Sequence, residues 1–183
     1  TLDQQNPEVA IALNTLREIN KQVQSEGWIF NIERHYEMTA DAATFEIEYP
    51  SNALQIDANR DQHFDDYDPT RRDGKLYDRH KHTFLWKDEA GAARTIQVDV
   101  VWLVDFTEVP NAIQNYITAR TAVMCAIKMV GDQQLVQLLQ QQEINTRASA
   151  LEYETQQGDY SMFGWKDGEN YHVGYQPYAA LQR

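Results

Sequence analysis

Apolar residues recur every three or four positions over the first part of the chain, between about residues 6 and 26. The stripe consists of Val9, Leu13, Leu16, Ile19 and Val23. This spacing predicts an amphipathic helix with its charged residues on the outer side. Asn6 is a good N-cap, Pro7 suits the first helical position, and Gly27 is the residue type that commonly follows a helix. We therefore expect a helix from about Asn6 to about residue 26.

From residue 28 to about residue 106 the apolar pattern changes to alternation, the period of a half-buried strand. Alternating apolar residues occur at Trp28, Phe30 and Ile32, and again at Phe45, Ile47 and Tyr49. Further strand candidates lie at 52–57, 75–77, 83–86 and 96–104, and the last of these is rich in β-branched and aromatic residues. Residues 88–91 are typical of a hairpin turn, and the charged segment 59–75 of a long exposed loop.

Helical spacing returns in two segments after Pro110, at about 110–130 and 132–156, with Gly131 and Asp132 between them. Asp132 is a suitable cap for the second of these helices. A helix of about 25 residues is ~37 Å long, which is more than a small domain needs for its own core. Because its flanks are rich in glutamine, including residues 140–142, we expect this helix to pack against something beyond its own domain.

The C-terminal segment, residues 158–183, lacks any period but contains many aromatic residues. They are Tyr160, Phe163, Trp165, Tyr171, Tyr175 and Tyr178. Disordered tails are normally poor in aromatic residues, whereas aromatic side chains anchor interfaces. We interpret the segment as a tail that folds onto a partner. A tail packed on its own domain remains the alternative.

These patterns predict an α+β fold: a helical bundle of long helices with an inserted antiparallel β-sheet region and an extended C-terminal tail. The expected division is a helical core of residues 1–27 and 107–157, a β-rich insert of residues 28–106, and an aromatic-rich tail of residues 158–183.

The chain has 16 basic and 28 acidic residues, which gives a net charge of −12. This balance argues against nucleic-acid binding, because DNA affinity comes mainly from Lys and Arg that neutralise phosphates. The single cysteine, Cys125, lies in an apolar helical segment and excludes an intrachain disulfide. We interpret it as a small core residue, not a nucleophile.

Two clusters could bind a metal, and neither has a complete pattern. His80 and His82 with Asp78 offer only three local ligands. The acidic residues of the loop, Asp57, Asp61, Asp65, Asp66, Asp68 and Asp73, lack the ligand spacing of a calcium loop. Nucleophile-elbow, zinc-protease, P-loop and dinucleotide-binding motifs are absent from the sequence. We therefore expect no catalytic residue, no cofactor and no metal.

A family resemblance starts at the first helix. Residues 16–24 (LREINKQVQ), followed by residues 27–33 (GWIFNIE), resemble the start of tail tubular protein A of short-tailed bacteriophages. Further similar segments follow in the same order at 74–79, at 110–119 and at 151–162. The resemblance thus spans about residues 1–163. Family members begin with one more helix, which implies a segment before Thr1.

The resemblance implies a structural virion protein, assembled in the host cytoplasm and located in the tail or neck of the virion. It implies a homo-oligomeric ring of twelve copies that joins the portal protein to the tail nozzle protein (tail tubular protein B). The ring would dock tail fibres, and DNA would pass through its channel during ejection without specific binding.

Two groups of residues are expected to serve this role. The expected partner interface comprises Tyr77, Asp78, Arg79, Tyr160, Phe163, Trp165, Tyr171, Tyr175 and Tyr178. The expected structural core comprises Trp28, Phe30, Ile32, Trp102 and Tyr116.

Two other functions remain open. A tail-associated polysaccharide hydrolase or glycan-binding protein would need a carboxylate pair in a cleft with an aromatic platform, such as Trp86 or Trp165. A generic assembly chaperone is a third possibility.

Overall fold

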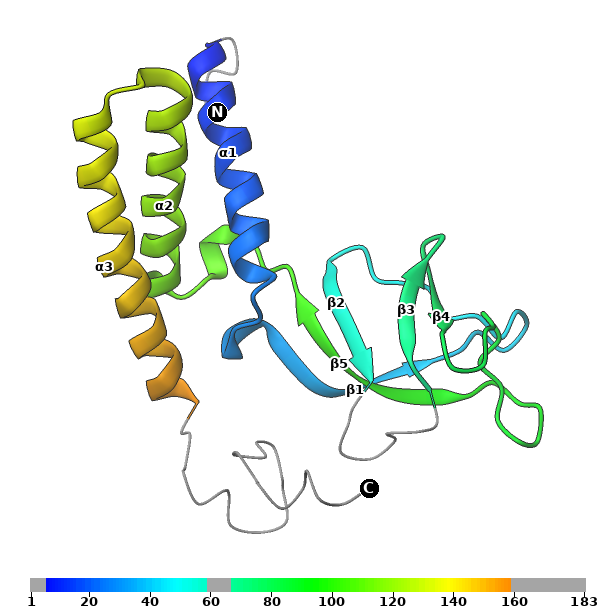
Figure 1. The fold of residues 1–183 in the computed structure, drawn as a ribbon. Helices are drawn as coiled ribbons and strands as arrows, with labels where there is room; N and C mark the ends of the chain where they lie inside the picture. Colours follow the sequence, from blue (N-terminus) through cyan, green and yellow to red (C-terminus); the bar gives the residue numbers. More distant parts are fainter. Residues whose placement is uncertain (1–5, 59–66, 159–183) are drawn as a thin grey trace.

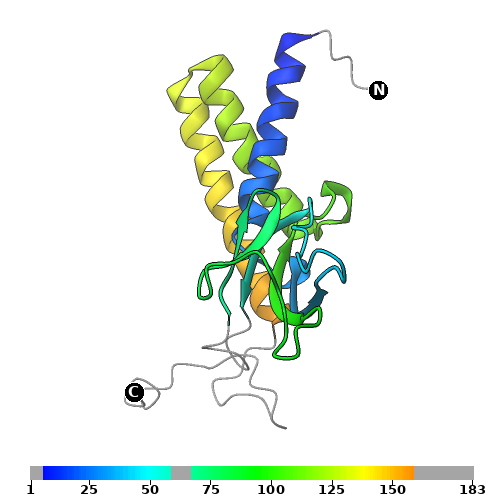
Figure 2. The same ribbon diagram turned by 90° about the vertical axis from the view of Figure 1, so that its right-hand side faces the viewer.

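The computed structural model describes residues 6–58 and 67–158, in which three helices stand side by side at one end and the strands lie at the other (Figure 1). The helices are α1 (Pro7–Gln24), α2 (Asn111–Cys125) and α3 (Gln133–Gln157). α2 packs against both α1 and α3. Towards its N-terminus α1 diverges from the α2–α3 hairpin (Figure 2).

The ends of the helices follow local chemistry. The Asn6 side chain accepts a hydrogen bond from the backbone N–H of Glu8 at 3.0 Å, and Gly27 takes a φ of 76° after the helix. α2 continues into a π-helix, η3 (Ala126–Val130), which ends at Gly131 with a φ of 71°. The Asp132 side chain caps α3 by accepting from the backbone N–H of Gln134. Among the described helices, none is long and apolar enough to cross a membrane.

The strands form two antiparallel sheets. The first has the order β1-β5-β2, from β1 (Ile32–Thr39), β5 (Thr95–Trp102) and β2 (Ala53–Ala58). The second is the hairpin of β3 (Pro69–Arg72) and β4 (Lys75–Asp78). β5 alternates buried residues with more exposed ones, so that Ile96, Val98 and Val100 point into the core.

The described residues form two separate apolar cores. The sheet core is built from Met38, Ala40, Ile47, Ala53, Ile56, Tyr67, Leu76, Trp86, Ile96, Val98 and Val100. The helical core is built from Ile19, Val23, Trp28, Val109, Ile113, Tyr116, Ile117 and Ala150. The sheet is therefore a unit with its own interior.

Two buried amide side chains, Gln24 and Asn31, join the helices to the sheet. The Gln24 amide donates to the carbonyl of Val104 at 2.9 Å and accepts from the N–H of the same residue at 2.8 Å. The Asn31 amide donates to the carbonyls of Gln24 and Trp102, at 3.0 and 2.8 Å, and accepts from the N–H of Trp28 at 2.8 Å. These bonds fix the end of α1 against the chain that leaves β5.

The structure corrects the expected fold class. Helices make up 48% and strands 23% of a mixed α+β fold, so the expected bundle of long helices with an inserted sheet is wrong. α1 has 18 residues and α2 has 15, which leaves α3, with 25, as the one helix of unusual length. Helical periodicity alone does not indicate that the strands enclose a core of their own.

Three local expectations also differ from the structure. Residues 28–31 are not a strand: Ile29–Asn31 form a 3-10 helix, η1, and β1 begins at Ile32. Strands were expected at 45–49 and at 83–86, but each segment makes only an isolated β-bridge. In the first, Glu48 pairs with Lys75, and in the second, Thr83 pairs with Asp78. The segment expected to be a loop contains β3.

The indole N–H of Trp28 donates to the Val23 carbonyl at 2.7 Å, and Glu154 of α3 accepts from the backbone N–H of Ile29 at 2.9 Å. The bond to the preceding Val23 carbonyl and the bond to the distant Glu154 carboxylate favour the tight turn over an extended strand, although the alternating side-chain pattern fits both.

Candidate subunit interface

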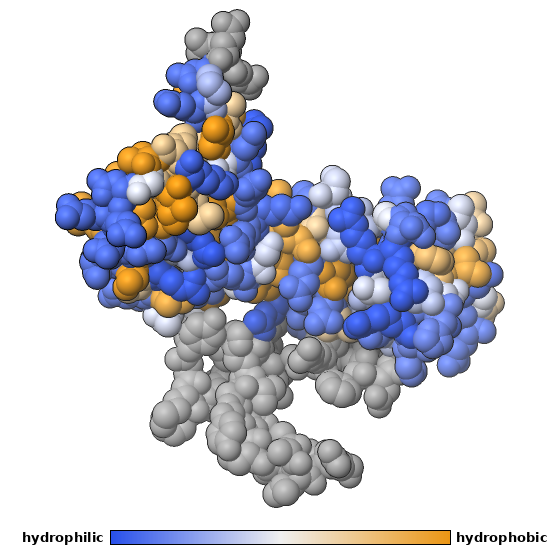
Figure 3. All heavy atoms as spheres, turned by 45° about the horizontal axis from the view of Figure 1, so that its top comes forward, coloured by the Kyte–Doolittle hydropathy of each residue, from blue (hydrophilic) through white to orange (hydrophobic). Residues whose placement is uncertain are grey.

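The exposed apolar side chains are concentrated on the helical part of the molecule. Figure 3 shows apolar side chains gathered over the outer end of this part. They are Ile11, Ile127, Met129, Val130, Leu135, Leu138, Ile144 and Leu151. Among the described residues, Leu85 is the one large exposed apolar side chain outside the helices. Contiguous apolar surface of this kind marks contacts with other molecules.

Helix α3 contributes most to this surface. Of its side chains, the structure places only Ala150 in the buried class. Leu138 is 69% exposed and Ile144 is 62% exposed. A helix normally gains most of its stability from packing of an apolar face; α3 packs one side against α2 and leaves its other sides uncovered.

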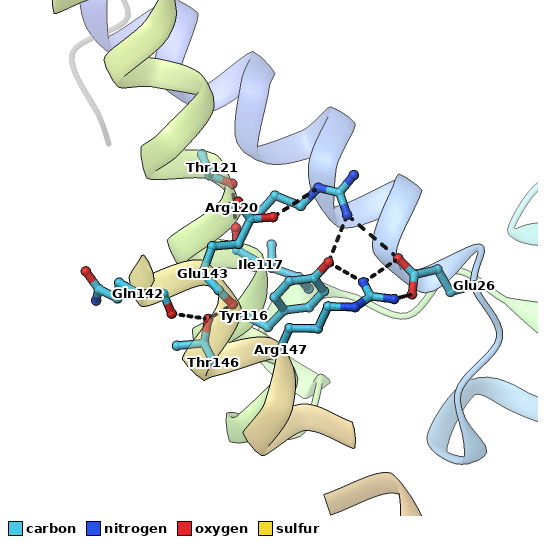
Figure 4. A network of polar contacts seen from close by, with 9 residues as sticks. All are labelled: Glu26, Tyr116, Ile117, Arg120, Thr121, Gln142, Glu143, Thr146 and Arg147. Carbon is cyan, nitrogen blue, oxygen red and sulfur yellow. Dashed lines mark hydrogen bonds and ion pairs between the residues drawn. The ribbon is translucent and has the colours of Figure 1, made fainter. Parts of the chain in front are cut away.

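Two charged residues of α3, Glu143 and Arg147, lie on the side of the helix that faces its own chain, where they bind other side chains (Figure 4). Arg147 donates to both carboxylate oxygens of Glu26, at 3.3 and 3.2 Å, and to the Tyr116 hydroxyl at 2.5 Å. The hydrogen bond to Glu26 is the main cause that raises the pKa of Arg147, followed by the one to Tyr116. Arg147 thus stays charged and ties α3 to the segment after α1.

Arg120 of α2 completes this network. It donates to the Tyr116 hydroxyl at 2.8 Å and lies 3.9 Å from a carboxylate oxygen of Glu143. The network therefore joins α2, α3 and the segment after α1 through a buried tyrosine. Glu143 and Arg147 were not singled out from the sequence, although they are the only charged residues between positions 133 and 151.

The expected interface residues Tyr77, Asp78 and Arg79 lie together at the end of the β3–β4 hairpin. Asp78 is only 2% exposed, and its carboxylate accepts from the backbone N–H groups of Asp68 and His80. Arg79 is ion-paired with Asp68 at 2.7 Å. The buried Asp78 carboxylate therefore holds the backbone at this end of the hairpin, while Tyr77 and Arg79 lie nearer the surface. A role of the three in partner binding stays a prediction.

The other expected interface residues, Tyr160, Phe163, Trp165, Tyr171, Tyr175 and Tyr178, lie outside the described residues.

The expected core residues lie where helices and sheet meet. Trp28 and Tyr116 are buried in the helical core, and Phe30 packs against it while partly exposed. Trp102 packs against the sheet core and forms an edge-to-face pair with Tyr36. Ile32 is partly buried at the start of β1.

Possible sites for chemistry are sparse in the part of the chain that the structure describes. His80 and His82 lie in the turn after β4 and not on a strand, and no group of three metal-ligating side chains occurs there. Trp86 is buried and its indole donates to the Leu76 carbonyl at 3.1 Å, so it offers no platform for a sugar.

One cleft of about 840 Å³ lies beside β1 and is lined by several carboxylates, among them Glu37, Asp41 and Glu46. Glu46 is ion-paired with Lys75. Backbone hydrogen bonds from Thr44, and then from Ala43, lower the pKa of Asp41, so this carboxyl is not held protonated as a general acid must be.

A mixed α+β chain whose helices leave apolar side chains uncovered has the surface of an assembly subunit. The family model described as tail tubular protein matches residues 1–160. The chain belongs to the tail tubular protein family, which confirms the resemblance seen in the sequence. It is therefore a structural protein of the phage tail. No curated protein sequence matches the chain.

Proposed function

We propose that this chain is the subunit of a homo-oligomeric ring, of twelve copies, that joins the portal protein to the tail nozzle protein (tail tubular protein B). The observation that carries the proposal is the apolar surface that η3, α3 and Ile11 of α1 leave uncovered. A ring closes through head-to-tail contacts, so each subunit must present two different faces to its neighbours. Membership of the tail tubular protein family supports the same role.

The two halves of the molecule suit different partners in this proposal. Residues 1–27 and 107–157 form the ring, and residues 28–106, with the corner at Tyr77, Asp78 and Arg79, face a tail fibre or another tail protein. The segment 158–183 binds the portal or nozzle through its aromatic residues. Assembly takes place in the host cytoplasm.

DNA passes through the ring during ejection without specific binding. The chain carries a net charge of −12. Acidic side chains near the channel would repel phosphates over about a Debye length, ~8–10 Å, and would leave the DNA mobile.

Solution mass tests the proposal. We expect the 21.3 kDa chain, alone or with purified portal, to form a particle close to twelve times its own mass in sedimentation or mass photometry. A chain that stays monomeric under both conditions, or that hydrolyses capsular polysaccharide, would contradict it.

A further inference from the structure

The strands that surround the sheet core leave a gap beside β1. β1, β5 and β2 form one sheet, β3 packs beside β2, and β4 pairs with β3 (Figure 1). The other edge of β4 binds the segment 45–49, where the backbone N–H of Leu76 donates to the Ile47 carbonyl at 2.9 Å. The N–H of Tyr49 donates to the Gly74 carbonyl, also at 2.9 Å. Within the described part of the chain no strand pairing joins this segment to β1, so the circuit of strands is open here.

The cleft of about 840 Å³ beside β1 occupies this gap. Its walls include residues 36–39 of β1 and residues 46–48 of the facing segment. A hollow over one face of a strand would touch every second residue, because side chains alternate between the two faces. Contact with consecutive residues therefore places the cleft along the edges of both segments. We refer to it as the β1 cleft.

The edge of β1 presents backbone hydrogen-bonding groups to the β1 cleft. Glu37 lies opposite Gln97 of β5. The backbone N–H of Gln97 donates to the Tyr67 hydroxyl at 3.1 Å, and its carbonyl accepts from the same hydroxyl at 2.6 Å. In an antiparallel pair, two opposed residues either bond to each other or both point away. The backbone groups of Glu37 therefore point away from β5, and those of Thr39, two residues further along, do the same.

The facing segment presents a similar edge. Glu48 lies opposite Lys75 in the bridge to β4, and the bonds of this bridge are made by the residues on either side, Ile47 and Tyr49. By the same alternation, the backbone groups of Glu48 point away from β4. An extended chain in the β1 cleft can thus pair with both walls and close the circuit of strands.

The side chains of the β1 cleft define what such a chain must carry. Met38 and Ile47, which are buried in the sheet core, contribute the apolar part of its lining. Glu37 and Glu48 lie on the two walls and are exposed, and neither forms an ion pair with a cation that the structure describes. Because the side chains of a strand alternate, an incoming strand can direct apolar residues to the core side and basic residues to the carboxylates.

We propose that the β1 cleft binds an extended segment of another protein, which alternates apolar with basic residues and adds as a strand to β1. Charge complementarity selects this occupant. The cleft is lined by four carboxylates and one cation: Glu37, Asp41, Glu46, Glu48 and Lys75. This excess of negative charge repels nucleic acid and a second copy of the chain, which carries −12. No group of three metal-ligating side chains occurs among the described residues, which disfavours a bound metal ion.

Binding of a synthetic peptide to the full chain tests the proposal. The probe is a fluorescein-labelled peptide of about nine residues, the length of a strand, in which lysine alternates with valine. One control peptide has glutamate in place of lysine. A second control has N-methylated valines, which keep the charge but remove the backbone N–H groups of one edge. By fluorescence polarisation we expect the lysine peptide to bind saturably and each control to bind at least about tenfold more weakly.

Variants of the two walls test the role of charge. Glu37→Gln combined with Glu48→Gln should weaken binding of the lysine peptide about three- to tenfold at low salt, as expected for two exposed ion pairs. The difference should largely vanish at about 1 M salt. The matched control, Glu108→Gln combined with Glu152→Gln, makes the same change of net charge at exposed positions of the helical part and should leave the Kd unchanged.

Amide hydrogen exchange followed by NMR locates the bound peptide. The amides of Glu37, Thr39 and Glu48 should exchange at least about tenfold more slowly in the complex, and those of α3 at the same rate as before. A lysine peptide that does not bind, or equal effects of the wall and control variants, would overturn the proposal and leave the carboxylates as protection of an open strand edge.

Equal binding of the N-methylated peptide would overturn the addition to β1. If the double wall variant is unfolded by circular dichroism, the two control peptides decide the question on the unchanged chain. The inference goes beyond the proposed ring, and all of these results are independent of whether the chain forms one.

Discussion

The sheet and helical parts of this molecule differ in how they use their apolar side chains. In the sheet part, Leu76, Val98 and Val100 are fully buried, and Leu85 is the one large apolar side chain that the described residues leave exposed there. In the helical part, α3 places Ala150 alone in the buried class. The sheet part thus encloses nearly all of its large apolar side chains, whereas the helical part leaves several of its own exposed.

The difference has a physical basis in how each part gains stability. Burial of apolar area contributes roughly 25 cal/mol per Å², and the sheet part gains it within its own chain. The helices enclose a core as well, and polar bonds through Tyr116, Arg147 and Glu26 add to it, while several of their apolar side chains stay exposed. A network of this kind fixes the geometry of α3 while its outer side remains open.

The largest effect that distinguishes the two parts is expected from a matched pair of leucine substitutions. Leu76→Ala should lower the free energy of unfolding by about 2–5 kcal/mol, because it opens a cavity in the sheet core. Leu138→Ala, at a 69% exposed position of α3, should change it by less than about 0.5 kcal/mol in the monomer. Urea unfolding measures both. Similar losses for the two variants would show that α3 is packed within its own chain.

The next effect concerns the joint between the two parts. Gln24→Leu keeps the volume of the side chain but leaves the N–H and carbonyl of Val104 without their partners. We expect a loss of about 1–3 kcal/mol, the cost of unsatisfied buried polar groups. The control is Gln22→Leu, an exposed position on the same helix, which should change stability by less than about 0.5 kcal/mol. Equal effects would show that the amide bonds of Gln24 do not hold the joint.

The smallest effect concerns Glu154, which contacts η1 from α3. Burial raises the pKa of this carboxyl above its ordinary value of 4.5, against the opposing hydrogen bond from Ile29. Its contribution to stability is therefore full below the pKa of the unfolded chain and is lost as pH rises through the raised value.

Glu154→Gln retains an acceptor for Ile29 and removes this titration. Measured by urea unfolding, the variant should therefore become more stable relative to the unchanged chain as the pH rises from about 4 to about 7, by less than about 1 kcal/mol because the group is only partly buried. A variant that loses stability over the same range would contradict the assignment. The pKa values of Asp41 and Asp105 are lowered, so these two groups make stability rise with pH. They do so equally in the variant and in the unchanged chain, and their effect cancels in the comparison.

Much of the secondary structure followed from local signals in the sequence. Asn6 with Pro7 marked the start of α1, Gly131 with Asp132 separated the last two helices, and the β-branched run marked β5. These elements could be predicted because caps and periodicity act over a few residues. The family resemblance also came from the sequence, at residues 27–33 in particular.

Features that depend on distant residues could not be predicted in this way. The turn at Ile29–Asn31 is held by the Glu154 carboxylate and by the Asn31 side-chain amide, which donates to the Gln24 backbone carbonyl; local alternation does not register these bonds. For the same reason, the amphipathic pattern of α3 could not show which of its sides faces its own chain. The positions of Glu143 and Arg147, as rare charges in a neutral segment, were the available signal for that side.

The measurement that tests the central claim most directly is a cryo-electron microscopy reconstruction of the neck of the assembled virion. Our account predicts a closed ring of this chain in which Ile144 and Leu151 of α3 are buried against the helices of the adjacent copy. A reconstruction in which α3 faces solvent, or in which the chain is absent from the virion, would contradict it.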